Sequence, residues 1–89
     1  MRERIVAVAI SRFGMTFTLP PPNRHHDVLR EMFQRFRIEQ DSATEQGFIT
    51  SEGRFVRRKL AARIARAARQ IGRKKRTDPQ DTLFSEDLW

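Results

Sequence analysis

The chain contains no cysteine and no tyrosine, and its 89 residues include only two histidines and one tryptophan. Without cysteine there is no disulfide framework, and two histidines alone argue against a structural zinc site. No apolar run approaches the ~20 residues of a membrane span. A single domain of this length has a thin core, and neither disulfides nor zinc reinforce it here. We therefore expect self-association into a homo-oligomer.

The N-terminus also lacks the pattern of a secretory signal. Charged residues at positions 2–4 precede an apolar stretch of only residues 5–10, which Ser11 and Arg12 end. Such a stretch is shorter than the apolar core of a signal peptide. We expect a cytosolic protein that has no membrane partner.

Residue sets that perform catalysis are missing as well. The chain shows no serine–histidine–aspartate spacing, no paired carboxylates on one face, no glycine-rich phosphate loop and no metal motif. The sequence therefore predicts a binding protein and no enzyme, without cofactor, metal ion or catalytic residue. A nuclease that uses His25 or His26 as general base stays open, although no motif points to it.

Positive charge is the feature present in excess. Eighteen lysines and arginines against eleven acids give a net charge of +7, which favours a phosphate-bearing partner. Eleven basic residues lie between Arg54 and Arg76, and no acid occurs between Glu52 and Asp78. Like charges at helical spacing weaken an isolated helix. The run predicts an anionic ligand, neutralisation by the acidic tail, or a solvated face.

The first half of the chain predicts a β-hairpin followed by a helix. Residues 5–10 form a continuous apolar run, and residues 15–19 alternate between apolar and threonine side chains, as in a half-buried strand. We expect the turn near Gly14 and an end at the three prolines of 20–22. An amphipathic helix over about 24–37 would bury Val28, Leu29, Met32, Phe33 and Phe36.

The second half predicts a short hairpin, a basic helix and a tail, which completes an α+β fold. Residues 46–50 and 54–56 flank a turn at Gly53, and the helix begins near Arg57. Its expected apolar stripe is Val56, Leu60, Ile64, Ala67, Ala68 and Ile71, and Gly72 would cap it. We expect one domain over 1–76. The tail, 77–89, ends in apolar residues that predict docking on its own or a neighbouring subunit.

Two places could contact an anionic ligand. Arg24 and His25 open a helix, where free N–H groups and the guanidinium fork suit phosphate; alternatively, the histidines cap the helix or pack under the loop. Adjacent helix positions diverge by about 100°, so His25 and His26 do not form a metal pair. Phe48 lies near Arg57 and Arg58 and could stack a base. Equally, it could belong to the core.

Several blocks of sequence together resemble a family of small phage proteins. The blocks are Leu-Pro-Pro-Pro-Asn-Arg-His-His-Asp-Val (19–28), Gln-Gly-Phe-Ile-Thr-Ser-Glu-Gly-Arg-Phe-Val (46–56), Ala-Ala-Arg-Ile-Ala (61–65), Gln-Ile (70–71) and Leu-Phe-Ser-Glu-Asp-Leu-Trp (83–89). As a set they are similar to the anti-Thoeris sponge proteins, whose functional counterparts counter the defence called CBASS. The resemblance covers nearly the whole chain.

The resemblance implies a homo-oligomer, with hexamers among its relatives. Such proteins bind cyclic nucleotide immune signals, for example glycocyclic ADP-ribose or a cyclic oligonucleotide, between subunits and without cleaving them. By position it implies that Arg24, with His25 beside it, contacts phosphate and that Phe48 stacks a base. Arg57 and Arg58 resemble a ligand-contacting turn, and Lys75 would complete the site. It further implies action in the cytoplasm of the infected host.

This chain departs from the family pattern at two positions. The family often has Asp or Asn where Arg57 stands and Gly where Arg69 stands. An arginine at 57 would change the contact with a ribose hydroxyl and favour a ligand with more phosphate groups. The identity of the ligand therefore stays open.

Two other functions stay open at this stage. A nucleic-acid-binding or protein-binding inhibitor, similar to an anti-CRISPR regulator, could use the arginine-rich second helix along a phosphate backbone. A structural oligomer without any ligand is the third hypothesis.

Overall fold

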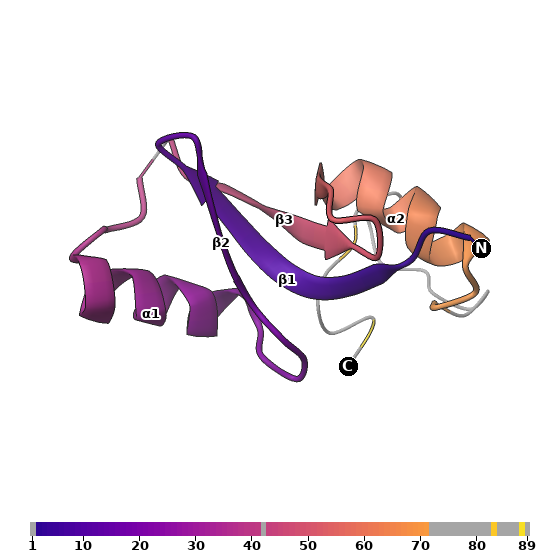
Figure 1. Ribbon diagram of the computed structural model, residues 1–89, viewed down its shortest axis with the longest axis horizontal. Coiled ribbons are helices and arrows are strands. Elements are labelled where there is room, and N and C mark those ends of the chain that lie inside the picture. Colours follow the sequence, from indigo (N-terminus) through magenta and orange to yellow (C-terminus); the bar gives the residue numbers. More distant parts are fainter. Residues whose placement is uncertain (1, 42, 72–82, 84–87, 89) are drawn as a thin grey trace.

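The computed structural model describes residues 2–41, 43–71, 83 and 88, which form a four-stranded antiparallel sheet with two helices (Figure 1). The elements are β1 (Ile5–Arg12), β2 (Met15–Leu19), α1 (His25–Phe36), β3 (Glu45–Thr50), β4 (Phe55–Arg57) and α2 (Arg58–Ala67). The strand order is β2-β1-β3-β4, so both hairpins join through the pairing of β1 with β3. The predicted α+β class is confirmed.

β1 lies at the centre of the sheet, which explains its unbroken apolar sequence. Val8, Ala9 and Ile10 are completely buried, so both faces of the strand are covered. At its far end Arg12 pairs with Met15 across a two-residue turn, Phe13 and Gly14, both with positive φ. Such turns match the twist of the flanking strands.

α1 contacts β1 and β2 through a narrower stripe than the sequence predicts. Val28 and Met32 are buried. Phe33 and Phe36 were expected in the same stripe, yet they are 45% and 54% exposed. Phe36 reaches only the edge strand, where its ring lies 5.5 Å from that of Phe17. The predicted apolar stripe of α1 is therefore wrong at its C-terminal end. β2 is the edge of the sheet, so no further strand is present for these side chains to pack against.

α2 packs through alanines. Ala61, Ala62 and Ala65 are buried, whereas Leu60 is 40% exposed and Ala67 is exposed. Of the predicted stripe, Val56 and Ile71 are buried and Ile64 packs against the core, so the prediction is wrong at Leu60 and Ala67 and missed the three alanines. α2 follows β4 without a loop, and the strand therefore fixes which face of the helix meets the sheet. Small side chains at this face permit a close approach of helix and sheet.

The end of α2 also differs from the prediction. The helix stops at Ala67, and Arg69 takes the left-handed conformation after it, with φ of 58°. Gly72, the predicted cap, lies outside the described residues. The Gln70 N–H then donates to the Ala65 carbonyl at 2.7 Å, which closes the last turn. The early end lets the Gln70 side chain bond both the N–H and the carbonyl of Ile5, at 2.7 and 2.8 Å.

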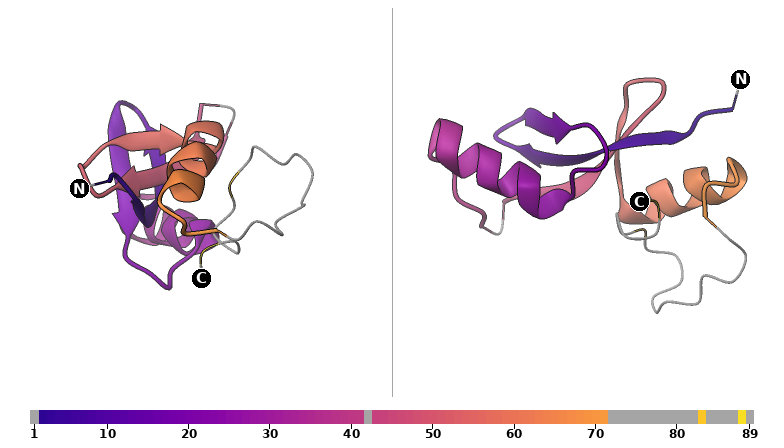
Figure 2. Two further views of the ribbon diagram at one scale, coloured as in Figure 1. Left: turned by 90° about the vertical axis from the view of Figure 1, so that its right-hand side faces the viewer. Right: turned by 90° about the horizontal axis from the view of Figure 1, so that it is seen from below.

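The two helices lie toward opposite ends of the curved β1 (Figure 2). Their buried side chains nevertheless belong to one core, which Phe48 of β3 joins at its centre. Two residues of the C-terminal tail pack on that core: Leu83 is completely buried, and Leu88 is partly so. The remainder of the tail and the expected boundary at residue 76 lie outside the described residues. No helix in the part of the chain described here is long and apolar enough to cross a membrane.

Candidate functional site

Three segments singled out from the sequence meet at the centre of the fold. His25, the first residue of α1, has its Nε2 2.8 Å from the Gly47 carbonyl oxygen of β3. The His25 ring meets the Phe48 ring edge-on, with centroids 5.1 Å apart. Gly47 pairs in turn with Arg57 of β4. The start of α1, the middle of β3 and the β4–α2 junction are thus neighbours.

Gly47 makes this convergence sterically feasible. A Cβ at this position would collide with the Val56 carbonyl oxygen and lie 2.7 Å from the Phe55 ring. The backbone of β3 at Gly47 therefore lies closer to β4 than a residue with a side chain would permit. The same glycine offers its carbonyl to His25, so one position fixes both sides of the site.

Phe48 does not form the stacking platform that the resemblance implies. Its side chain is 0% exposed, enclosed among the core residues of β1, β4 and both helices. A base needs an open ring face, and Phe48 offers none in this protomer. The core alternative is the one that the structure supports. His25 is buried too, because its ring packs on Phe48.

Arg24 is the N-cap residue of α1 and lies half-buried beside His25. Its backbone N–H donates to Asp27 Oδ2 at 2.8 Å. Asp27 thus places a carboxylate in the first turn, where the helix dipole favours an anion. An external phosphate at this helix end would have to share the position with Asp27.

Arg57 and Arg58 are adjacent but differ in what holds them. Arg57 is exposed and ion-pairs with Glu45 on the neighbouring strand. Its side chain is 70% exposed, and pairs of this kind stabilise a fold by about 0–1 kcal/mol. An incoming phosphate could replace Glu45 at small cost.

The Arg58 side chain makes structural contacts within the fold. It donates to the Leu83 carbonyl at 2.7 Å and to Gln46 Oε1 at 2.6 Å. Its guanidinium carbon lies 6.0 Å from the centre of the Phe48 ring. Arg58 therefore anchors the tail over the centre of the fold. Lys75, the remaining candidate, lies outside the described residues.

A second basic cluster was missed by the sequence reasoning. Arg2, Arg4 and Arg69 line a groove of about 620 Å³ together with Ala67 and Ala68. Residues 2 and 4 lie far in the sequence from residues 67–69, so no local pattern joins them. The one available signal was the Arg-Glu-Arg alternation at 2–4, which places both arginines on one side of an extended segment.

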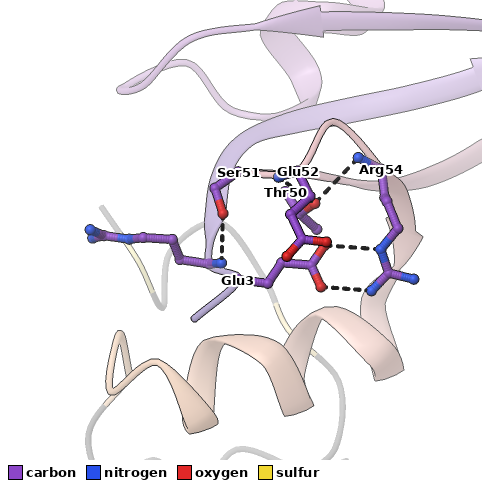
Figure 3. Close-up of polar contacts among 6 residues, drawn as sticks. Glu3, Thr50, Ser51, Glu52 and Arg54 are labelled. Atoms are coloured by element: carbon purple, nitrogen blue, oxygen red, sulfur yellow. Dashed lines mark hydrogen bonds and ion pairs between the residues drawn. The ribbon is translucent and has the colours of Figure 1, made fainter. Parts of the chain in front are cut away.

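Glu3, between those arginines, is bound on the other side. Its carboxylate accepts two bonds from Arg54, at 2.9 Å from Nε and 2.8 Å from Nη2 (Figure 3). These bonds, with a further contribution from Thr50, lower the pKa of Glu3 from 4.5 to about 2. Glu3 therefore stays ionised and engaged at neutral pH.

The acidic and histidine residues form no metal centre in the described part of the chain: no group of three or more could hold an ion. The site thus consists of Arg58 over the buried His25–Phe48 pair, with Arg57 exposed beside it in the sequence and Arg24 at the start of α1.

Residues 4–89 match a family model described as "Phage T4 y16D protein". The chain belongs to this phage protein family. No curated protein matches, and no solved structure does. The y16D family match includes the start of α1, the β3–β4 hairpin and α2, and thus every candidate site residue. Its name specifies a phage origin and no activity.

Proposed function

We propose that this phage protein sequesters a cyclic nucleotide immune signal, a cyclic ADP-ribose isomer or a cyclic oligonucleotide, without cleaving it. It acts as a homo-oligomer in the cytoplasm of the infected bacterial host. The observation that carries the proposal is that Arg58 lies over the buried His25–Phe48 pair, while the neighbouring Arg57 is exposed and held only by Glu45. Arg24 precedes His25 at the start of α1. Guanidinium groups match phosphate oxygens in shape and charge.

The surroundings of His25 favour binding over catalysis. Its Nε2 is occupied by the Gly47 carbonyl, and its ring is buried, so it does not reach a substrate in the protomer. A general base must lie within hydrogen-bond reach of the proton that it removes. A protein that only retains its ligand needs no such group.

Arg57 is the cation on which the proposal depends most, since Arg58 is engaged with Gln46 and Leu83. With Phe48 in the core, the cyclic nucleotide is held through its phosphates rather than by stacking on that ring. Subunit contacts would enclose the exposed Arg57 and exclude water. Charge–phosphate bonds strengthen in such a site.

The test is native mass spectrometry with a panel of cyclic nucleotides, including glycocyclic ADP-ribose and cyclic dinucleotides and trinucleotides. We expect saturable retention of at least one compound by a defined oligomer. Heating the complex should release the ligand with unchanged mass and chromatographic mobility. A hydrolysed product would make the protein an enzyme, and failure to retain any compound would refute sequestration.

A pair of variants around Arg57 tests its role in both directions. Arg57→Ala should weaken retention by about tenfold, as expected for the loss of a charged hydrogen bond. Glu45→Gln removes the competing carboxylate, so it should strengthen retention about two- to fivefold. Arg35→Ala removes one positive charge from an equally exposed ion pair on α1, with Glu31, and serves as the control. Equal effects of Arg57→Ala and Arg35→Ala would exclude a specific contact.

The second candidate function is a nucleic-acid-binding inhibitor. One observation favours it: Lys59, Arg63 and Arg66 are all exposed along α2, a pattern that suits a phosphate backbone. Filter binding to duplex DNA and RNA, with salt varied around 0.1 M, distinguishes the two proposals. Affinity that falls steeply with salt would support the second one, and no binding at about 0.1 M salt would exclude it.

A further inference from the structure

The groove lined by Arg2, Arg4 and Arg69 lies at the opposite end of α2 from Arg57 and Arg58. α2 has ten residues, which corresponds to about 15 Å between its ends. The groove therefore takes no part in the site proposed above. Its volume of about 620 Å³ lies within the range of small-molecule pockets.

The N-terminal wall of the groove is firmly built. The Arg4 N–H donates to Ser51 Oγ at 3.1 Å, and the Arg4 carbonyl accepts from the Ser51 N–H at 2.8 Å. Ile5 is held by both ends of the Gln70 amide. The backbone that carries the Arg4 side chain is thus fixed on both sides. Binding of a ligand would therefore cost little entropy for ordering this backbone.

The alternation of residues 2–4 separates the charges of this segment. Glu3 points toward Arg54, and its carboxylate is fully used there (Figure 3). It therefore does not neutralise the arginines on either side. Within residues 2–71, leaving out position 42, Arg4 and Arg69 form no ion pair, and they line the groove without an acidic neighbour among its lining residues.

The carbonyl end of α2 would repel an anion here. Arg2 offsets it, because its Nη1 donates to the Ala67 carbonyl at 3.0 Å. A guanidinium has five N–H donors, so this bond leaves others available for a ligand.

Arg69 occupies a backbone position that favours glycine. Its φ of 58° lies in the left-handed region, where a Cβ costs free energy. The chain nonetheless presents a guanidinium to the groove from this position. Such strain is consistent with a binding role for the side chain.

We propose that this groove is a second anion site, which binds the phosphate groups of a small diphosphate-containing molecule through Arg2, Arg4 and Arg69. Three guanidinium groups around one open groove present forked donors to several phosphate oxygens at once. The inference is independent of the proposed function, because none of its residues belongs to the site at Arg24, Arg57 and Arg58.

The test uses inorganic pyrophosphate as the probe and the full chain, followed by calorimetry and by NMR of the backbone amides at low salt. We expect saturable binding, with amide shifts concentrated at residues 2–5 and 67–70. Arg4→Gln and Arg69→Gly should each weaken binding by about tenfold. Arg63→Ala removes the same charge from an exposed position on α2 outside the groove, and should change affinity less than about twofold.

Arg69→Gly also separates binding from folding. Because glycine relieves the left-handed strain, this variant should unfold about 3 °C higher while it binds more weakly. Equal weakening by Arg63→Ala and Arg69→Gly, amide shifts elsewhere, or a dissociation constant above about 1 mM would overturn the proposal. Retention of a cyclic nucleotide should be unaffected by Arg69→Gly, so either proposal can fail without the other.

Discussion

Gly47 is the residue on which the central packing depends most directly. Its backbone lies against Val56 and Phe55 on one side, and its carbonyl contacts His25 on the other. Any side chain there would push β4 away from β3, so the position demands glycine for space rather than for an unusual φ.

Gly47→Ala should lower the free energy of unfolding by about 2–3 kcal/mol, the cost of overpacking a tight contact. Denaturant titration followed by circular dichroism measures this change. Gly53→Ala is the matched control. Gly53 has φ of 81° and no atom near its missing Cβ, so only left-handed strain of about 1 kcal/mol is expected. A smaller loss for Gly47→Ala than for Gly53→Ala would contradict the close approach.

Glu3 gives the fold a dependence on acid. Its pKa is lowered to about 2 in the folded chain by its bonds with Arg54 and Thr50, from 4.5 in the absence of these partners. When folding lowers the pKa of a carboxyl group, that group stabilises the folded state at pH values above its pKa in the unfolded chain. This contribution is lost as the pH falls toward its pKa in the folded chain.

Glu3→Gln should therefore unfold at a lower temperature than the wild type at pH 7. The gap between the two melting temperatures should stay constant above about pH 5 and close between about pH 4.5 and 2. Thermal melts at a series of pH values provide the measurement. A gap that persists unchanged at pH 2 would show that the carboxylate charge has no part in it.

At the scale of elements, the tail is held by the first residue of α2. The Leu83 N–H donates to the Arg58 carbonyl at 3.2 Å, and the Leu83 carbonyl accepts from the Arg58 side chain at 2.7 Å. The Leu83 side chain is completely buried in the core. A residue this far along the sequence therefore completes the core that the two hairpins and helices leave open.

Leu83→Ala should cost about 3 kcal/mol of unfolding free energy, in the range of buried leucine truncations. Leu60→Ala makes the same chemical change at a position that is 40% exposed, and should cost less than about 1 kcal/mol. Chemical denaturation of both variants measures the difference. Indistinguishable midpoints would mean that the tail contributes nothing to the core.

The elements themselves were predictable from the sequence because their periods are plain. Alternation at 15–19, the apolar run at 5–10 and helical spacing after residue 27 located both hairpins and both helices. The buried faces were less predictable. Phe33 and Leu60 fit a helical stripe but remain exposed, since burial depends on where the sheet ends and on how β4 runs into α2.

The candidate site was predictable as a set of segments but not as a surface. The sequence singled out Arg24, Phe48 and Arg57, and the fold brings their segments together. The sequence could not show that Phe48 is enclosed, because an aromatic residue in a strand occurs in cores and on binding surfaces alike. Nor could it join Arg2 with Arg69, whose proximity arises only from the fold.

At the scale of the whole molecule, β2 is an edge of the sheet without charged residues. Natural edges are usually protected by charge or proline. The sequence Met-Thr-Phe-Thr-Leu reads nearly the same in both directions about Phe17. An antiparallel pairing of two copies centred on Phe17 would set Thr16 opposite Thr18 of the second copy. The exposed Phe36 and the groove of about 300 Å³ between β2 and α1 lie beside this edge.

The proposed oligomer should therefore form through β2 and depend on its free edge. Thr16→Lys places a charge on an exposed position of that edge. Because a two-fold contact carries the substitution on both subunits, the oligomer mass measured by light scattering should fall by half or more. Thr16→Val keeps the strand propensity without the charge and should leave the mass unchanged. An unaltered oligomer in Thr16→Lys would mean that subunits associate elsewhere, leaving the β2 edge free.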